Sequence, residues 1–111
     1  MVAQRKPVIA SRQALRDIDD AVDHYLLEAG VETATRFIGA IEKAFELIAR
    51  EPGIGSPRYA HELQIPDLRS WGLSAFPYVV LYIVGNGAAD VLRVLHGARD
   101  IPATLTGPEP A

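Results

Sequence analysis

Two amphipathic stretches separated by a single glycine place the tightest constraint on this fold. The first opens at Ser11, a residue suited to helix N-capping, and the second is stopped by Pro52 and Gly53. Gly30 suits the left-handed position that ends a helix. Helices joined so tightly must lie antiparallel, as an αα-hairpin. We expect their apolar stripes to be core: Leu15, Ile18, Val22, Tyr25, Leu26 and Ala29, then Ala34, Phe37, Ile38, Ile41, Ala44, Phe45 and Ile48.

The rest of the ordered chain reads as strands. Residues 7–10 form a short one before the helices, and residues 68–73 a second after them. Residues 78–84 give the strongest strand signal, and a Gly-Asn-Gly turn leads into a returning strand at 90–96. The order is β-α-α-β-β-β. We therefore predict a two-layer α+β domain, with the αα-hairpin packed on one face of a mainly antiparallel sheet.

Residues 78–84 are apolar or aromatic at every position, which is typical of a strand covered on both faces. One helical layer covers only one face of the sheet, so the other face must be covered by a partner, by a long loop or by the C-terminal tail. The loop at 51–67 is rich in Pro and Gly and shows no clear period; a short strand or turn near 62–65 is the alternative. We expect a single domain over 1–101 and a mostly disordered tail over 102–111.

Composition and charge narrow the class of protein. The chain has 111 residues, is 49% hydrophobic and contains no cysteine, which excludes disulfides and thiolate chemistry. No apolar run is long enough to span a bilayer, and no signal peptide is evident, so we expect a cytoplasmic protein without a membrane partner. A net charge of −3 argues against direct binding to nucleic acid. Only two of the 11 basic residues are lysines, and arginine favours bidentate pairing with carboxylates or phosphates.

The search for catalytic motifs finds no nucleotide-binding loop and no histidine–glutamate pair at zinc-binding spacing, so we expect no cofactor and no metal. We expect His24 on the surface of the first helix and His61 in the loop. His96 closes the last strand, beside Arg99 and Asp100. This cluster is either a functional site or a strand end with a satisfied Arg–Asp pair.

The chain resembles the RelE/ParE superfamily of type II toxin–antitoxin toxins, and its ParE-like branch best. The resemblance runs from about residue 7 to residue 101. It rests on an ordered set of segments and residues: 14–18 with Tyr25, Gly30, Ala34, Arg36 and Phe37, the stretch 47–55, Leu68-Arg69, residues 76–82, and 91–100. The final Arg-x-x-His-Gly-x-Arg-Asp stretch makes the set specific.

This resemblance implies a toxin neutralised by a ParD-like ribbon-helix-helix antitoxin, which would carry any DNA binding and repress the operon together with the toxin. RelE-like members cut mRNA on the ribosome, whereas ParE-like members act on DNA gyrase. Cleavage of RNA needs a residue that takes the 2′-hydroxyl proton. No lysine follows Lys43, and arginine cannot act as this base. His96, His61, Tyr78 or Tyr82 could serve instead, so an mRNA endonuclease stays the alternative.

We expect a non-enzymatic inhibitor of DNA gyrase that has no catalytic residues and acts by protein–protein contact. A third interpretation is an inactive toxin relic kept for complex assembly. The residues expected to bind the target or the antitoxin are Arg69, Tyr82, Arg93, His96, Arg99 and Asp100. We expect Arg99 to be the main anchor, and Arg69 and Arg93 to add positive charge nearby.

Overall fold

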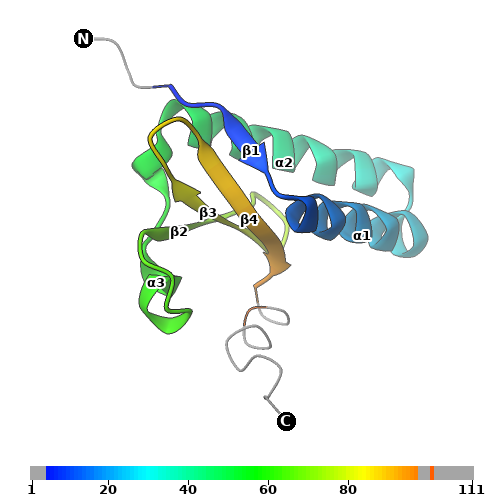
Figure 1. The fold of residues 1–111 in the computed structure, drawn as a ribbon. Coiled ribbons are helices and arrows are strands. Elements are labelled where there is room, and N and C mark those ends of the chain that lie inside the picture. Colours follow the sequence, from blue (N-terminus) through cyan, green and yellow to red (C-terminus); the bar gives the residue numbers. More distant parts are fainter. Residues whose placement is uncertain (1–4, 98–100, 102–111) are drawn as a thin grey trace.

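The computed structural model describes residues 5–97 and residue 101. Two long helices lie on one side of a four-stranded sheet, and a short third helix lies away from them (Figure 1). The elements are β1 Val8–Ala10, α1 Arg12–Ala29, α2 Val31–Arg50, the 3-10 turn η1 Pro52–Ile54, α3 Arg58–Glu62, β2 Leu68–Gly72, β3 Tyr78–Val84 and β4 Ala89–His96.

Gly30 joins α1 to α2 without any intervening loop. Its φ of 95° lies in the region that favours glycine, and its N–H donates to the Tyr25 carbonyl, 2.9 Å away. The same residue is the N-cap of α2. At the other end of α1, the Ser11 side chain accepts a hydrogen bond from the Ala14 N–H. The predicted αα-hairpin is confirmed.

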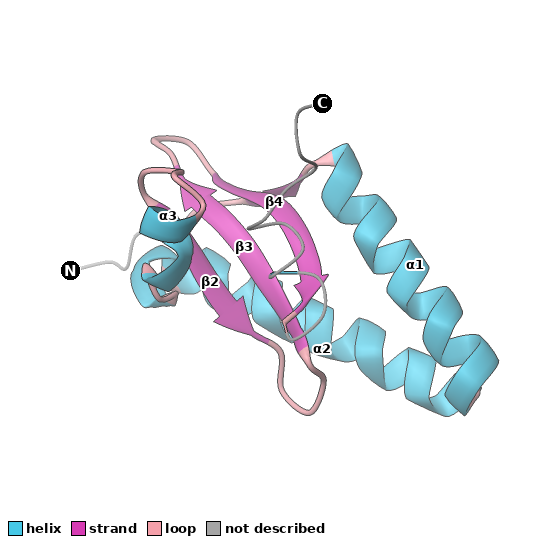
Figure 2. Ribbon diagram, turned by 90° about the horizontal axis from the view of Figure 1, so that it is seen from below, coloured by secondary structure: helices cyan, strands magenta, loops and turns pink. Residues whose placement is uncertain are grey.

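The sheet has the strand order β1-β4-β3-β2. The β2–β3 and β3–β4 pairs are antiparallel, whereas β1 runs parallel to β4. The register shifts between Leu81 and Tyr82, which leaves Leu92 unpaired as a bulge in β4. The predicted α+β fold is therefore confirmed, and its first strand pairs with its last. Figure 2 shows α2 crossing behind the sheet with α1 beside it.

The first face of the sheet, which the two helices cover, carries the larger core. Phe37 and Ile48 of α2 are fully buried against side chains of β3 and β4, and Ala14 and Ala21 of α1 complete the contact. Phe45 is half-buried and packs against this core, so the expectation that it is buried there is confirmed only in part. Ile38, also assigned to the stripe, is 42% exposed. The core-facing stripe of α2 is thus narrower than its apolar pattern.

The second face has its own smaller core, built from Leu68, Leu81, Leu95 and Ile101. The segment 51–67, expected as a loop, contains η1 and α3. Of these, α3 packs on this smaller core and covers part of the second face. Of the short strand or turn considered near residues 62–65, the structure contains a turn directly after α3. The two-sided apolar pattern of β3 is thereby explained. Residues 102–111, expected as a disordered tail, lie outside the described residues.

Candidate partner-binding groove

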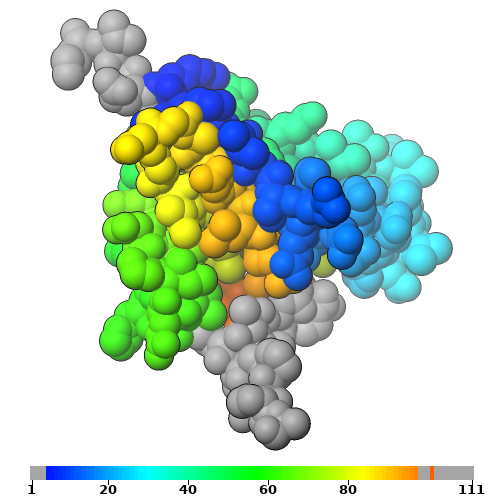
Figure 3. Space-filling model, in the orientation of Figure 1, coloured from blue at the N-terminus to red at the C-terminus, as the bar shows by residue number. Residues whose placement is uncertain are grey.

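An open groove of about 580 Å³ lies on the second face of the sheet, between the start of α1 and the segment that follows α3. In Figure 3 the orange surface of β4 is visible between green α3 and the blue start of α1. We call this site the second-face groove. It is lined by Ser11, Arg12, Gln13, Leu63, Ile65, Leu68, Leu81, Leu92 and Arg93.

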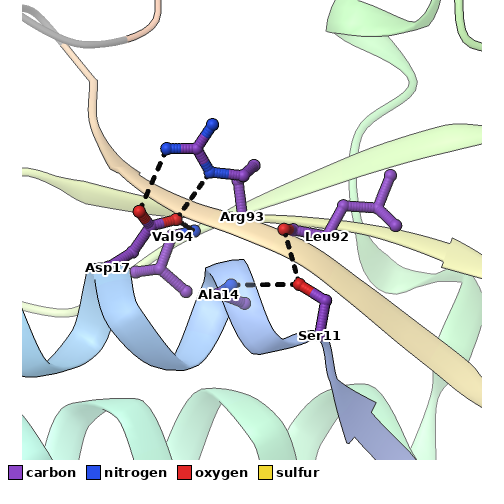
Figure 4. A network of polar contacts seen from close by, with 6 residues as sticks. All are labelled: Ser11, Ala14, Asp17, Leu92, Arg93 and Val94. Carbon is purple, nitrogen blue, oxygen red and sulfur yellow. Dashed lines mark hydrogen bonds and ion pairs between the residues drawn. The ribbon is translucent and has the colours of Figure 1, made fainter.

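Ser11 fixes the α1 side of the groove to the sheet. Its backbone N–H donates to the Val91 carbonyl at 2.9 Å, and its hydroxyl donates to the Leu92 carbonyl at 2.9 Å. The same hydroxyl caps the helix at the Ala14 N–H (Figure 4). Because the helix start is tied to β4 by two hydrogen bonds, the exposed Arg12 side chain stands at a defined place on the rim.

Arg93 stands on the same rim and is held by Asp17 of α1. The guanidinium donates Nε to Asp17 Oδ2 at 2.8 Å and Nη2 to Oδ1 at 3.0 Å, a bidentate geometry (Figure 4). Asp17 Oδ2 also accepts the Val94 backbone N–H at 2.9 Å. The side chains are 31% and 13% exposed, so solvent screens this pair less than a surface pair. Arg93 is thus positioned and still reachable from the groove.

Arg69 and Tyr82 lie elsewhere and hold the loop at residues 52–55. The Tyr82 side chain is fully buried; its hydroxyl donates to the Pro52 carbonyl at 2.8 Å and accepts the Gly55 N–H at 2.9 Å. Arg69 donates to the carbonyls of Gly55 and Gly53, at 2.7 and 3.2 Å. Burial raises the pKa of the Tyr82 hydroxyl above its ordinary value, and the Gly55 hydrogen bond and the Arg69 charge oppose that rise. The structure gives both residues a role in holding the fold together.

The structure does not bring Arg69 and Arg93 together. Arg69 is in register with Tyr82, which belongs to the first-face core, whereas Arg93 is in register with Leu81 of the second-face core. Antiparallel partners share a face of the sheet, so the two arginines project from opposite faces. The expectation that Arg69 and Arg93 form part of one surface is therefore wrong.

His96 ends β4 with its ring edge-on against Tyr78, at a centroid separation of 5.4 Å. It is half-buried, as is the Gly97 that follows. His24 is exposed, as expected. Arg99 and Asp100 lie outside the described residues, so their part in the site stays a prediction.

Asp17 is the residue of this site that the sequence interpretation missed. It lies three residues after Ala14 and four before Ala21, both buried, so it is an acid on the inward stripe of α1. An acid at such a position requires a cationic or N–H partner, and β4 provides both. The spacing of Asp17 from Ala14 and Ala21 is therefore the sequence signal that could have identified it.

Over residues 5–97 and 101, no three His, Asp or Glu side chains gather closely enough to hold a metal ion. Likewise, no helix in this range has the length and apolarity needed to cross a membrane.

Comparison with known proteins identifies the family. The model of a family described as the ParE toxin of the type II toxin–antitoxin system, parDE, matches residues 8–101. The match begins with β1 and ends at the buried Ile101, so it spans both faces of the sheet. This chain belongs to the ParE toxin family. Membership of a toxin–antitoxin system implies an antitoxin partner.

Individual ParE relatives agree with this assignment. Toxin ParE1 of Caulobacter vibrioides is 32% identical over 100 residues, which cover 90% of this chain and 98% of that protein. A chain from a solved structure, the chromosomal ParDE TA system from P. aeruginosa, superposes with a TM-score of 0.71 at 22% identity. It covers 84% of this chain and 97% of its own. The second match shows that the two chains share a fold.

Proposed function

We propose that this toxin inhibits DNA gyrase by protein–protein contact in the cytoplasm, without an enzymatic step. The observation that carries the proposal is the lining of the second-face groove. Among the residues that the structure describes, the lining consists of leucines, an isoleucine, two arginines, a serine and a glutamine, without His, Tyr, Lys, Asp or Glu. Cleavage of RNA needs a group that takes the 2′-hydroxyl proton, and arginine stays protonated. This lining suits binding rather than proton transfer.

The antitoxin in this proposal is a ParD-like ribbon-helix-helix protein whose C-terminal segment occupies the second-face groove. The apolar floor around Leu92 fits leucine-like side chains, and Arg12 fits a carboxylate on the same segment. Contact with operator DNA passes through the antitoxin, since the toxin itself has a net charge of −3.

Leu92→Asp tests the antitoxin contact. Leu92 is half-buried on the groove floor, so a carboxylate there should weaken toxin–antitoxin binding by at least about tenfold. Leu27→Asp is the matched control, because Leu27 is 84% exposed at the far end of α1. Affinity is measured by calorimetry with the purified ParD-like antitoxin. Equal affinity of the Leu92→Asp variant and the wild type would place the antitoxin elsewhere.

Induction of the toxin alone tests the target. We expect SOS induction and filamentation in cells, and loss of supercoiling by purified gyrase in the presence of the toxin. Arg99→Glu should abolish both while leaving the circular dichroism spectrum unchanged. His96→Gln should retain most of the growth inhibition, because a contact surface needs no proton transfer.

Other results point to the alternatives. Rapid arrest of translation, cleavage of ribosome-bound mRNA and silencing by His96→Gln would establish the RelE-type endonuclease instead. Absence of any growth effect would favour the inactive relic.

A further inference from the structure

A second cavity, of about 370 Å³, lies where α2 overhangs the edge strand β2. Its apolar side is formed by Ala44, Leu47 and Leu73, with the half-buried Trp71 ring beside them. Two cations, Lys43 and Arg50, line the same cavity. It belongs to α2 and the outer end of β2, whereas the second-face groove lies between α1 and the segment after α3.

The two cations belong to a longer basic stripe. Arg36, Lys43 and Arg50 are seven residues apart on α2. A heptad step returns to nearly the same side of a helix, with a drift of about 20°, and advances about 10.5 Å along it. All three side chains are exposed. They are the only basic residues on α2 and form a single row beside the cavity.

The cations at the cavity are not neutralised within the described part of the chain. There, neither Lys43 nor Arg50 forms an ion pair or a side-chain hydrogen bond, and the one ion pair is Asp17–Arg93. Glu46 lies within one helical turn of both cations but pairs with neither. By comparison, Arg69 and Arg93 are engaged by loop carbonyls and a carboxylate. The pair at the cavity is thus available to an external anion.

We propose that this cavity binds an acidic segment of a protein partner. One bulky apolar side chain enters between Leu47 and Trp71, and two carboxylates about 10 Å apart pair with Lys43 and Arg50. The aromatic ring and the apolar floor provide the anchor, and the cations set the orientation. An acidic peptide fits better than a nucleic acid, because Leu47, Leu73 and Trp71 provide an apolar floor for a side chain and the two cations beside it are few for a run of phosphates.

Trp71 makes the proposal directly measurable, since it is the only tryptophan in the chain and it lines the cavity. Peptides are selected from a random library on the full-length protein and are then screened for a shift of Trp71 emission. We expect the selected peptides to carry two acids flanking an apolar residue. The strongest one should shift Trp71 emission saturably, and the Lys43→Glu/Arg50→Glu double variant should weaken its binding by at least about tenfold.

Arg16→Glu is the matched control, since Arg16 is an exposed arginine on α1 that lines neither cavity. It should bind the selected peptide as the wild type does. The neutral Lys43→Gln/Arg50→Gln variant, which should also lose affinity, separates charge loss from charge reversal, and circular dichroism checks that each variant folds.

Three results would overturn the proposal: selected peptides without acidic residues, equal binding by the wild type and the double variant, or tighter binding of a thymidine oligonucleotide than of the peptide. None of these depends on gyrase or on the antitoxin, so the proposed function is tested separately.

Discussion

Removal of one hydroxyl, in Tyr82→Phe, should destabilise the toxin through the loop at residues 52–55. This hydroxyl satisfies the Pro52 carbonyl and the buried Gly55 N–H at 2.8 and 2.9 Å. Each net hydrogen bond contributes about 1 kcal/mol, and a buried donor left without a partner costs about 1–3 kcal/mol, so we expect a loss of about 2–3 kcal/mol. Urea unfolding followed by Trp71 fluorescence measures it.

The matched control for this loss is Tyr59→Phe. Tyr59 is half-buried in the second-face core, and no hydrogen bond of its hydroxyl is found in the described part of the chain. Its loss should stay below about 0.5 kcal/mol. If Tyr82→Phe costs no more than this control, the loop is held by other contacts and the reasoning fails.

Gly55→Ala gives a second test of the same contact. A Cβ atom at this position would stand 2.6 Å from the Tyr82 hydroxyl and 2.9 Å from its Cε1. Alone, this substitution should cost about 1–3 kcal/mol. Combined with Tyr82→Phe it should cost less than the sum by about 1 kcal/mol, because the shortest contact has disappeared. Strict additivity would show that the loop moves away from the ring.

The pH dependence follows from the raised pKa of Tyr82. An unfolded tyrosine loses its proton near the ordinary value of 10.0, whereas the folded hydroxyl keeps its proton to higher pH. The stabilisation is therefore complete below pH 10 and is lost as pH rises through the folded pKa. Unfolding of the wild type at about pH 8 and about pH 11 should show this loss, and Tyr82→Phe should show a smaller one. Equal losses would mean that Tyr82 is not the responsible group.

Three further perturbations complete the set. Phe37→Ala should cost about 3–5 kcal/mol and exceed Phe45→Ala, since Phe37 is fully buried and Phe45 is not; urea unfolding of both variants decides. Asp17→Asn should cost about 1–3 kcal/mol of unfolding free energy, because the bidentate pair and the charged acceptor for the Val94 N–H are lost. A loss below about 0.5 kcal/mol would mean that solvent screens the pair. Deletion of residues 103–111 should leave the melting temperature nearly unchanged, and loss of folding after this deletion would contradict a dispensable tail. Ile101→Ala should lower the melting temperature by several degrees, because Ile101 is buried.

Local patterns predicted most of the backbone. Gly30 between two helical stripes led to the αα-hairpin, and the uniformly apolar residues 78–84 led to a strand with two covered faces. α3 was missed because five residues are too short to display a helical period.

The candidate site was less predictable. Arg93 and Asp17 meet across 76 residues of chain, and only strand order and register create that contact. Arg69 and Arg93 looked alike in the sequence, but the pleat of the sheet sends them to opposite faces. Tyr82 was predicted to bind a partner because the strand pattern does not reveal that its hydroxyl donates to the Pro52 carbonyl.

The parallel pairing of β1 with β4 sets a condition on synthesis of the toxin. Ser11 and Leu92, joined by a hydrogen bond, are 81 residues apart, and β4 lies between β1 and β3 in the sheet. A nascent chain that has not yet released residues 89–96 from the ribosome has neither the central strand nor the Val91 and Val94 side chains of the core. Folding of this domain is therefore delayed until residues 89–96 have left the ribosome. A chain that ends before β4 therefore has neither the Arg93 rim nor the second-face groove.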